Sequence, residues 1–189
     1  MNQNKVEIMP EIVLLLAKGP SHGRAIAQKL EVPLSTVQRC LHQLLAELVV
    51  DYTLVGRNKE FHLRNTLSLK RYLIDAEYYR LNRLIFRNTW LHPILEKLSR
   101  LEAELIIIFG SYATFREKKD SDLDVFMETQ NQELKRAGEA IHSRISVKIG
   151  QMDVKDLLIQ EILANHIIVK GAEEYYERFF AQTASRGKD

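Results

Sequence analysis

Residues 105–127 read LIIIFGSYATFREKKDSDLDVFM, and this stretch decides the fold. Its first five residues are apolar and rich in β-branched side chains, which predicts a short buried strand. Gly110 and Ser111 follow this strand directly. Ten residues later come Asp122 and Asp124, inside a second strand-like run over residues 122–127. The pattern predicts a strand, a glycine-containing turn, a helix and a second strand.

The residue types in this stretch suit phosphate and metal chemistry. A glycine directly after a strand lets the backbone approach a phosphate, because no Cβ is in the way. A helix beginning near Tyr112 would direct free N–H groups and its positive dipole end at the same phosphate, and Ser111 adds a hydroxyl donor. On a strand, Asp122 and Asp124 point to one face, which suits Mg²⁺ bound together with substrate phosphates.

Each motif alone is more often a turn or a solvated strand end, but their order and spacing together favour a functional site. The stretch resembles the DNA polymerase β-like nucleotidyltransferase superfamily, and within it the minimal nucleotidyltransferases. Their signature is Gly-Ser, ten residues, then Asp-x-Asp, which Gly110, Ser111, Asp122 and Asp124 match position for position. The resemblance implies nucleotide binding by Gly110 and Ser111, Mg²⁺ binding by the two aspartates, and catalysis by Ser111 with both acids.

Active members of this superfamily carry a third carboxylate on a strand that follows the Asp-x-Asp strand. Here that strand is residues 144–149, RISVKI, whose polar face offers Ser146 and Lys148 and no acid. Lys148 would oppose a metal or contact the triphosphate. The sequence therefore supports nucleotide binding more strongly than turnover.

Upstream, the sequence predicts three helices followed by a β-hairpin. The helices are expected over residues 6–17, 22–30 and about 35–48, with Ser21 capping the second, and the strands over 49–55 and 60–63. The run AIAQKLEVPLSTVQRCLHQLLAELVV, residues 25–50, resembles winged helix-turn-helix domains. We therefore expect residues 1–65 to form such a domain.

In a winged helix the third helix lies in the major groove of DNA, and the wing contacts phosphate or the minor groove. The residues expected to contact DNA are Ser35, Thr36, Gln38, Arg39 and His42 on the third helix, and Arg57 and Lys59 at the wing tip. A winged helix that binds protein instead remains open, because the domain carries only a small positive charge and phosphate neutralisation dominates DNA affinity.

Residues 66–101 are expected to form a helical linker that Pro93 interrupts. Its arginines (Arg71, Arg80, Arg83 and Arg87) are interpreted as solvated, and a role in homodimerisation remains open. Residues 102–182 are expected to form the nucleotidyltransferase-like domain, with a small mixed sheet flanked by helices, and residues 183–189 a disordered tail. The predicted fold class is α+β.

Composition excludes several classes of protein. No apolar run approaches the roughly 20 residues that span a bilayer, and the N-terminus does not read as a secretory signal. One cysteine, Cys40, excludes an internal disulfide framework and fits a reducing cytoplasm. We therefore expect a cytoplasmic protein.

The combined reading is a Mg²⁺-dependent enzyme that moves a nucleoside monophosphate from an NTP to a hydroxyl, coupled to DNA binding. The resemblance implies a protein acceptor, in some members a ribonuclease toxin that an antitoxin adenylylates. The alternative is a transcription regulator whose degenerate nucleotidyltransferase domain only binds or senses a nucleotide.

Overall fold

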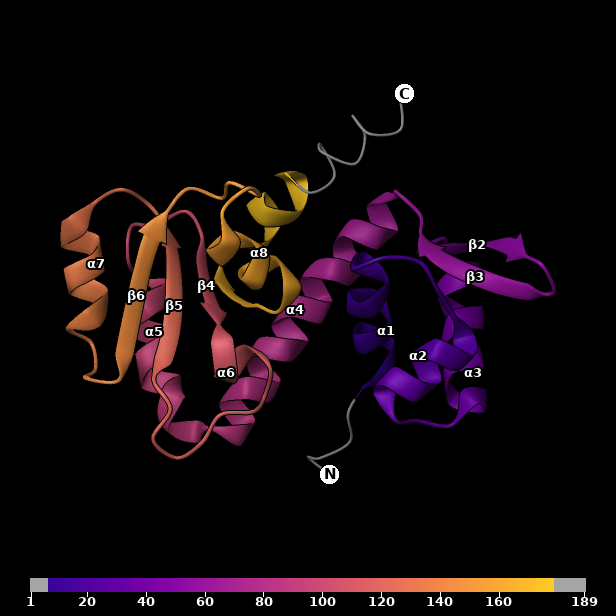
Figure 1. Cartoon of the computed structure of the whole chain (residues 1–189), viewed down its shortest axis with the longest axis horizontal. Coiled ribbons are helices and arrows are strands. Elements are labelled where there is room, and N and C mark those ends of the chain that lie inside the picture. The colour runs from indigo at the N-terminus through magenta and orange to yellow at the C-terminus, as the bar shows by residue number, and fades with distance from the viewer. Residues whose placement is uncertain (1–6, 179–189) are drawn as a thin grey trace. The chain divides into compact units, whose positions relative to one another are not determined.

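The computed structural model describes residues 7–178 and divides into two compact units between Ala76 and Glu77 (Figure 1). The predicted tail over residues 183–189 lies outside the described residues. The predicted last helix is described as far as residue 178, with residues 172–178 helical. Both units combine helices with a small sheet, which confirms the α+β class.

The first unit has the winged helix-turn-helix fold that the sequence predicted. Its elements are α1 (Ile8–Ala17), β1 (Ser21–His22), α2 (Gly23–Leu30), α3 (Leu34–Ala46), β2 (Val50–Val55) and β3 (Asn58–Leu63). The strands form an antiparallel sheet in the order β1-β3-β2. Ile12 of α1, Ile26 of α2 and Leu41 of α3 are almost fully buried, so all three helices share one core.

Ser21 does not cap the second helix as predicted. It is buried in β1 and pairs with Phe61 of β3, while α2 begins at Gly23 without a side-chain cap. A two-residue strand is too short to leave a periodic pattern in the sequence. Only the pairing with a distant strand reveals it.

Helix α4 (Leu67–Arg87) contributes residues to both units. At its start, the Thr66 hydroxyl donates to the carbonyl of Leu48 at 2.9 Å and accepts the backbone N–H of Leu69 at 3.2 Å. This capping ties the beginning of α4 to the first unit. The side chains of Leu69, Leu73 and Ala76 on this helix are buried.

The second unit is built around a four-stranded mixed sheet, as predicted. Its further elements are η1 (Thr89–Leu91), α5 (His92–Ser99), β4 (Ile106–Phe109), α6 (Gly110–Ala113), β5 (Leu123–Glu128), α7 (Gln132–Glu139), β6 (Ile145–Gly150), α8 (Leu157–Ala164) and β7 (Ile167–Lys170). The strand order is β6-β5-β4-β7. β4 is antiparallel to β5 and to β7, whereas β5 and β6 are parallel.

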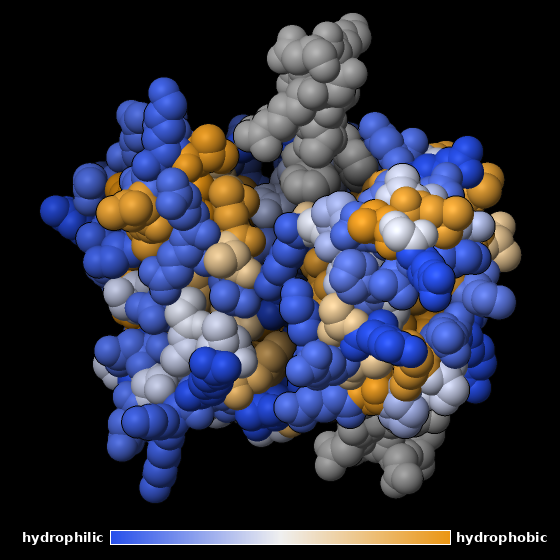
Figure 2. Space-filling view, turned by 45° about the vertical axis from the view of Figure 1, so that its right-hand side comes forward, coloured by the Kyte–Doolittle hydropathy of each residue, from blue (hydrophilic) through white to orange (hydrophobic). Residues whose placement is uncertain are grey.

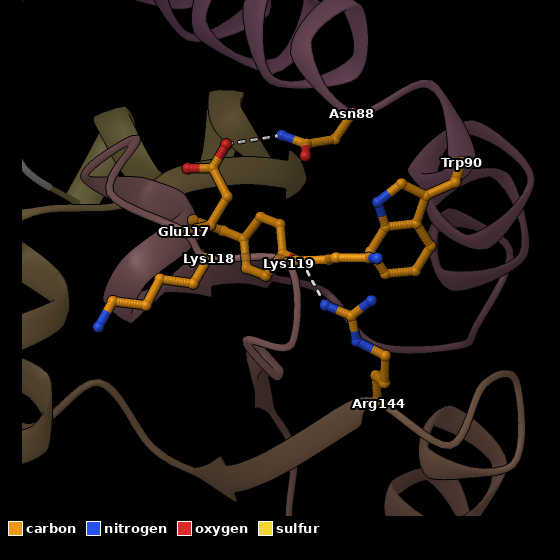
Figure 3. A pocket seen from close by; sticks show the side chains of 7 residues that line it. Asn88, Trp90, Glu117, Lys118, Lys119 and Arg144 are labelled. Carbon is orange, nitrogen blue, oxygen red and sulfur yellow. Dashed lines mark hydrogen bonds between the residues drawn. The ribbon is translucent and has the colours of Figure 1, made fainter.

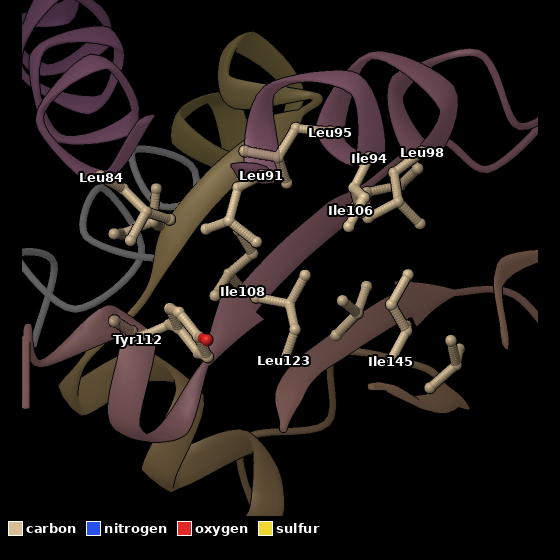
Figure 4. Close-up of a cluster of buried hydrophobic side chains, with 14 of the residues drawn as sticks. Leu84, Leu91, Ile94, Leu95, Leu98, Ile106, Ile108, Tyr112, Leu123 and Ile145 are labelled. Atoms are coloured by element: carbon tan, nitrogen blue, oxygen red, sulfur yellow. The ribbon is translucent and has the colours of Figure 1, made fainter. Parts of the chain in front are cut away.

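One face of this sheet carries the core of the second unit. Leu123 and Val125 of β5 are buried there with alternate residues of β4 and β6, and they pack against side chains of η1 and α5 such as Leu91 and Leu95 (Figure 4). Because successive side chains of a strand point to opposite faces, Asp124 lies on the other face.

The predicted helix boundary at Pro93 is wrong. Pro93 lies in the first turn of α5, where its missing N–H costs no helical bond, and α4 has already ended at Arg87. Asp156 caps α8 by accepting the backbone N–H of Leu158 at 2.8 Å. Just before this helix, Asp153 accepts the backbone N–H of Lys155 at 3.0 Å.

The surface mixes polar and apolar side chains. Figure 2 shows a largely hydrophilic face interrupted by separate hydrophobic patches. Within residues 7–178, no helix combines the length and the apolar character that crossing a membrane requires.

A buried polar cluster fixes the second half of α4 within the second unit. Glu77 is 1% exposed, and its Oε1 accepts the hydroxyl of Tyr176 at 2.8 Å and lies 3.5 Å from Nε2 of His166. Burial raises the pKa of Glu77, but its interaction with His166 at 3.5 Å, together with Arg80 and Tyr176, outweighs burial and lowers the pKa. The cluster therefore stabilises the ionised form of Glu77.

This lowered pKa predicts a pH-dependent contribution to stability. Such a contribution is complete above the unfolded-state pKa, about 4.3, and is lost as the pH falls through the folded-state value. We expect Glu77→Gln to reduce the free energy of unfolding at neutral pH by about 1–3 kcal/mol, and the difference from wild type to shrink in acid. Thermal unfolding measured across this pH range tests the prediction.

Tyr176→Phe is the matched control, because it removes a hydrogen bond and leaves the carboxylate. It should destabilise the protein while keeping most of the wild-type pH dependence, because His166 and Arg80 still lower the pKa of Glu77. A Glu77→Gln difference that stayed constant in acid would contradict an ionised Glu77.

Candidate functional site

Gly110 lies where β4 ends and α6 begins, directly beside the carboxylate of Asp124. The antiparallel register pairs Phe109 with Asp124, so the next residue of the chain passes over the aspartate side chain. Gly110 has a φ of +67°, and a Cβ at this position would lie 2.7 Å from Oδ2 of Asp124. Glycine is therefore required here both by the backbone conformation and by the close approach. The structure brings the Gly-Ser turn and the Asp-x-Asp strand together.

Ser111 and Asp122 flank this contact. Ser111 is half-buried as the second residue of α6, a four-residue helix that begins two residues before the predicted start. Asp122 is exposed and immediately precedes β5, whereas Asp124 is half-buried within it. The strand thus begins one residue later than predicted.

Asp124 sits in a region of concentrated negative charge. Burial raises the pKa of its carboxyl above the usual value, and the charges of Asp122 and Glu161 raise it further, while Lys148 acts in the opposite direction. A cation bound beside Asp124 would relieve this repulsion. The electrostatics therefore fit a site for a positively charged ligand.

The strand after Asp-x-Asp carries no acid on its polar face, as the sequence predicted. Ser146 pairs with Asp124 in the parallel register, and Lys148 is exposed two residues further on. Sequence reasoning missed Glu161, because only the packing of α8 near β4 brings its charge to Asp124. Across residues 7–178, no group of three or more His, Cys, Asp or Glu side chains could hold a metal ion.

Three arginines of α4 hold the loop that joins α6 to β5. Arg80 is buried and donates from Nη2 to the carbonyl of Ala113 at 2.8 Å. The guanidinium carbon of Arg83 lies 4.4 Å from the ring centroid of Phe115, and that of Arg87 lies 5.5 Å from it. The expectation of solvated arginines is wrong for Arg80, which is buried, whereas Arg87 is exposed as expected although it also contacts the loop. In the sequence, Arg80, Arg83 and Arg87 are three and four residues apart, which places them on one face of the helix. This spacing could have predicted that they act together.

The predicted DNA-contacting residues of the first unit lie on its surface. Those on α3 are exposed except for the half-buried Thr36, and both wing-tip residues are exposed; the set is Ser35, Thr36, Gln38, Arg39, His42, Arg57 and Lys59. Nζ of Lys59 lies 4.0 Å from the ring centroid of Tyr52. The wing also exposes Leu54 and Val55, at 70% and 52%, which fits the protein-binding alternative.

The close approach at Gly110 predicts a specific energetic coupling. We expect Gly110→Ala to cost about 2–4 kcal/mol of stability, combining left-handed backbone strain with overpacking against Asp124. In an Asp124→Ala background the cost should fall to about 1–2 kcal/mol, because only the backbone strain remains. Denaturant unfolding of the four proteins of this double-mutant cycle measures the coupling.

Asp122→Ala provides the matched background, since it removes the neighbouring acid but not the contact. Gly110→Ala should keep its full cost there. An equal cost in the Asp122→Ala and Asp124→Ala backgrounds would show that no such contact exists.

Comparison with solved structures gives weak similarities. The chain is 19% identical to the adhesin competence repressor AdcR from Streptococcus pyogenes, with a TM-score of 0.39 over 49% of this chain and 69% of that chain. A toxin-antitoxin structure with AMP-PNP is 17% identical, with a TM-score of 0.34 over 58% and 85%. Hypothetical protein PyrSV_gp04 from Pyrobaculum spherical virus is 15% identical, with a TM-score of 0.29 over 88% and 94%. Similarity at this level does not say what this chain binds.

Family models give a sharper result. The search of curated proteins found no match to the chain, whereas a family model does match it. Residues 91–178, which include Gly110, Ser111, Asp122 and Asp124, match the family model described as Polymerase beta, Nucleotidyltransferase. The sheet, the glycine turn and the acidic strand described above all fall within this range. Residues 91–178 therefore form a nucleotidyltransferase domain of the polymerase β family.

Proposed function

We propose that the second unit transfers a nucleoside monophosphate from an NTP to a hydroxyl, with Mg²⁺ as cofactor, and that the first unit binds DNA. One observation carries the proposal: Gly110 lies against the half-buried carboxylate of Asp124, where a Cβ would come within 2.7 Å of Oδ2. This contact places an acid directly against the backbone of the Gly-Ser turn.

The residues of this turn can act on a triphosphate. Gly110 lets the carboxylate of Asp124 lie against the turn, and the hydroxyl of Ser111 can donate a hydrogen bond to a phosphate oxygen. A phosphate would be repelled by Asp122 and Asp124, because all of these groups are negative. Binding a triphosphate here therefore requires a cation between the phosphates and the acids.

Mg²⁺ fits this requirement. Asp122 and Asp124 would hold it through hard carboxylate oxygens, and its charge would offset the repulsion that raises the pKa of Asp124. Bound there, the ion would neutralise the negative charge on the phosphates and on the leaving pyrophosphate. The remaining ligands would come from the NTP, as is usual for Mg²⁺.

The second candidate is a cytoplasmic transcription regulator whose nucleotidyltransferase domain binds a nucleotide without turnover. It is favoured by the polar face of β6, where Ser146 and Lys148 offer no acid. An enzyme needs a group that takes the proton from the acceptor hydroxyl. Glu161, whose charge acts on Asp124, is the acid through which the first candidate would meet this need.

For the enzyme we propose a hydroxyl on a partner protein as acceptor, with the partner encoded by a neighbouring gene. The resemblance to minimal nucleotidyltransferases supports this choice, and an antitoxin acting on a ribonuclease toxin is one form of it. A homodimer is also proposed, through α4, where Tyr78 and Phe86 are 50% and 69% exposed.

The enzyme proposal predicts transfer of label from ATP to protein. Incubation with Mg²⁺, ATP labelled at the α-phosphate and the neighbouring gene product should label a protein band. Asp122→Ala/Asp124→Ala should lower the rate by about 100-fold or more, because the site loses its metal ligands. Asp120→Ala, which removes an exposed acid of the same loop, should label like wild type.

Labelling that survived in the double variant would refute the assignment of the site. Saturable, Mg²⁺-dependent ATP binding without any labelling would instead support the regulator.

The DNA-binding proposal predicts loss of affinity on changing α3. In gel shifts with the protein's own promoter, Arg39→Ala should weaken binding by about 10-fold or more, the range expected for losing a bidentate contact to guanine. Arg57→Ala should weaken binding to all sequences alike and reduce the salt dependence. Lys29→Ala, at an exposed lysine of α2, is the control. Binding indifferent to salt and to Arg39 would favour a protein partner for the winged helix.

A further inference from the structure

A pocket of about 350 Å³ lies beside the loop that joins the Gly-Ser turn to the Asp-x-Asp strand. Besides Glu117, its lining side chains are Asn88, Trp90, Tyr112, Lys118, Lys119 and Arg144 (Figure 3). They come from η1 and the residue before it, from α6, from the loop and from the start of β6. The pocket therefore gathers residues from four parts of the second unit.

This pocket does not share a face of the sheet with Asp124. Tyr112 is buried in the core cluster together with Leu123 and Val125, and Trp90 packs against that cluster. Asp124 alternates with Leu123 and Val125 along β5 and so lies on the opposite face. A ligand in the pocket can consequently bind without using the two aspartates.

The charge of the pocket favours an anion. Lys118 and Lys119 are exposed, and within residues 7–178 neither side chain forms an ion pair. Glu117 is the acid of the lining, but its side chain is only 8% exposed, and Oε1 accepts the amide of Asn88 at 2.9 Å and lies 3.5 Å from Nε of Arg87. Because these partners offset the charge of Glu117, the lysines and Arg144 dominate.

The arginine and the aromatic rings are held in place before any ligand binds. Nη2 of Arg144 donates to the hydroxyl of Tyr112 at 3.1 Å, and Nε donates to the carbonyl of Ser121 at 3.2 Å. The guanidinium carbon lies 4.7 Å from the ring centroid of Trp90. A preorganised site loses less entropy when it captures a ligand.

We propose that this pocket binds a nucleoside phosphate, with the base against Trp90 and the phosphate at Lys119 and Arg144. Aromatic rings offer stacking surfaces to any base, and cationic side chains bind phosphate through charge-assisted hydrogen bonds. The volume lies in the range of small-molecule sites. This second nucleotide site goes beyond the proposed catalytic function and does not depend on it.

The single tryptophan of the chain makes the proposal directly testable, because Trp90 reports on the pocket itself. The full-length protein is titrated with AMP in EDTA while tryptophan fluorescence is followed. We expect saturable quenching that weakens as salt is raised. Lys119→Ala should weaken AMP binding by about 10-fold, whereas Lys97→Ala, at an exposed lysine of α5 outside the pocket, should not.

Two further titrations separate this proposal from its rivals. Asp122→Ala/Asp124→Ala should bind AMP like wild type, and loss of binding would assign the nucleotide to the catalytic face instead. Ribose 5-phosphate should bind more weakly than AMP. Equal affinity would mean that the pocket recognises only the phosphate, and it would overturn the role of Trp90 in binding the base. Absence of saturable quenching, or an unchanged Lys119→Ala, would also overturn the proposal.

Discussion

The close approach of the backbone at Gly110 to the carboxylate of Asp124 is the constraint on which the candidate site depends. It requires a residue without a side chain, a positive φ at the end of β4 and an antiparallel register that pairs Phe109 with Asp124. A shift of one residue in that register would turn the acid into the core face. The spacing between the two motifs therefore reflects geometry, because the loop must return the chain to this register.

The second half of α4 holds the loop between α6 and β5 in place. Glu77 anchors the helix through a buried cluster, and Arg80, Arg83 and Arg87 reach from one helix face to the segment that follows α6. Phe115, which these arginines surround, has a φ of +55°, an uncommon conformation for a bulky residue. Strained backbone of this kind persists where surrounding contacts over-determine it, so the arginines explain how the loop keeps its path.

The sequence predicted those parts of the fold that depend on local pattern. Buried strands, the winged-helix order and the meeting of Gly110 with Asp124 follow from periodicity and motif spacing. It did not predict the two-residue strand at Ser21, the packing of Arg80 or the charge of Glu161 near Asp124. Each of these depends on a contact between segments far apart in the chain, and no local pattern encodes such a contact. The prediction from Pro93 failed for a different reason. Proline breaks a helix in its interior but is well tolerated in the first turn, where Pro93 lies.

The electrostatics around Asp124 bear on both candidate functions in the same way. Burial and two neighbouring acids raise the pKa of its carboxyl, so the ionised group is held at a cost to the folded state. Packing alone gives no reason to place the half-buried Asp124 among other acids. Binding of a cation together with a phosphate ligand would give such a reason. Both proposed functions, enzyme and sensor, would begin with this binding. The two proposals differ in whether an acid reaches the acceptor hydroxyl, the role proposed above for Glu161.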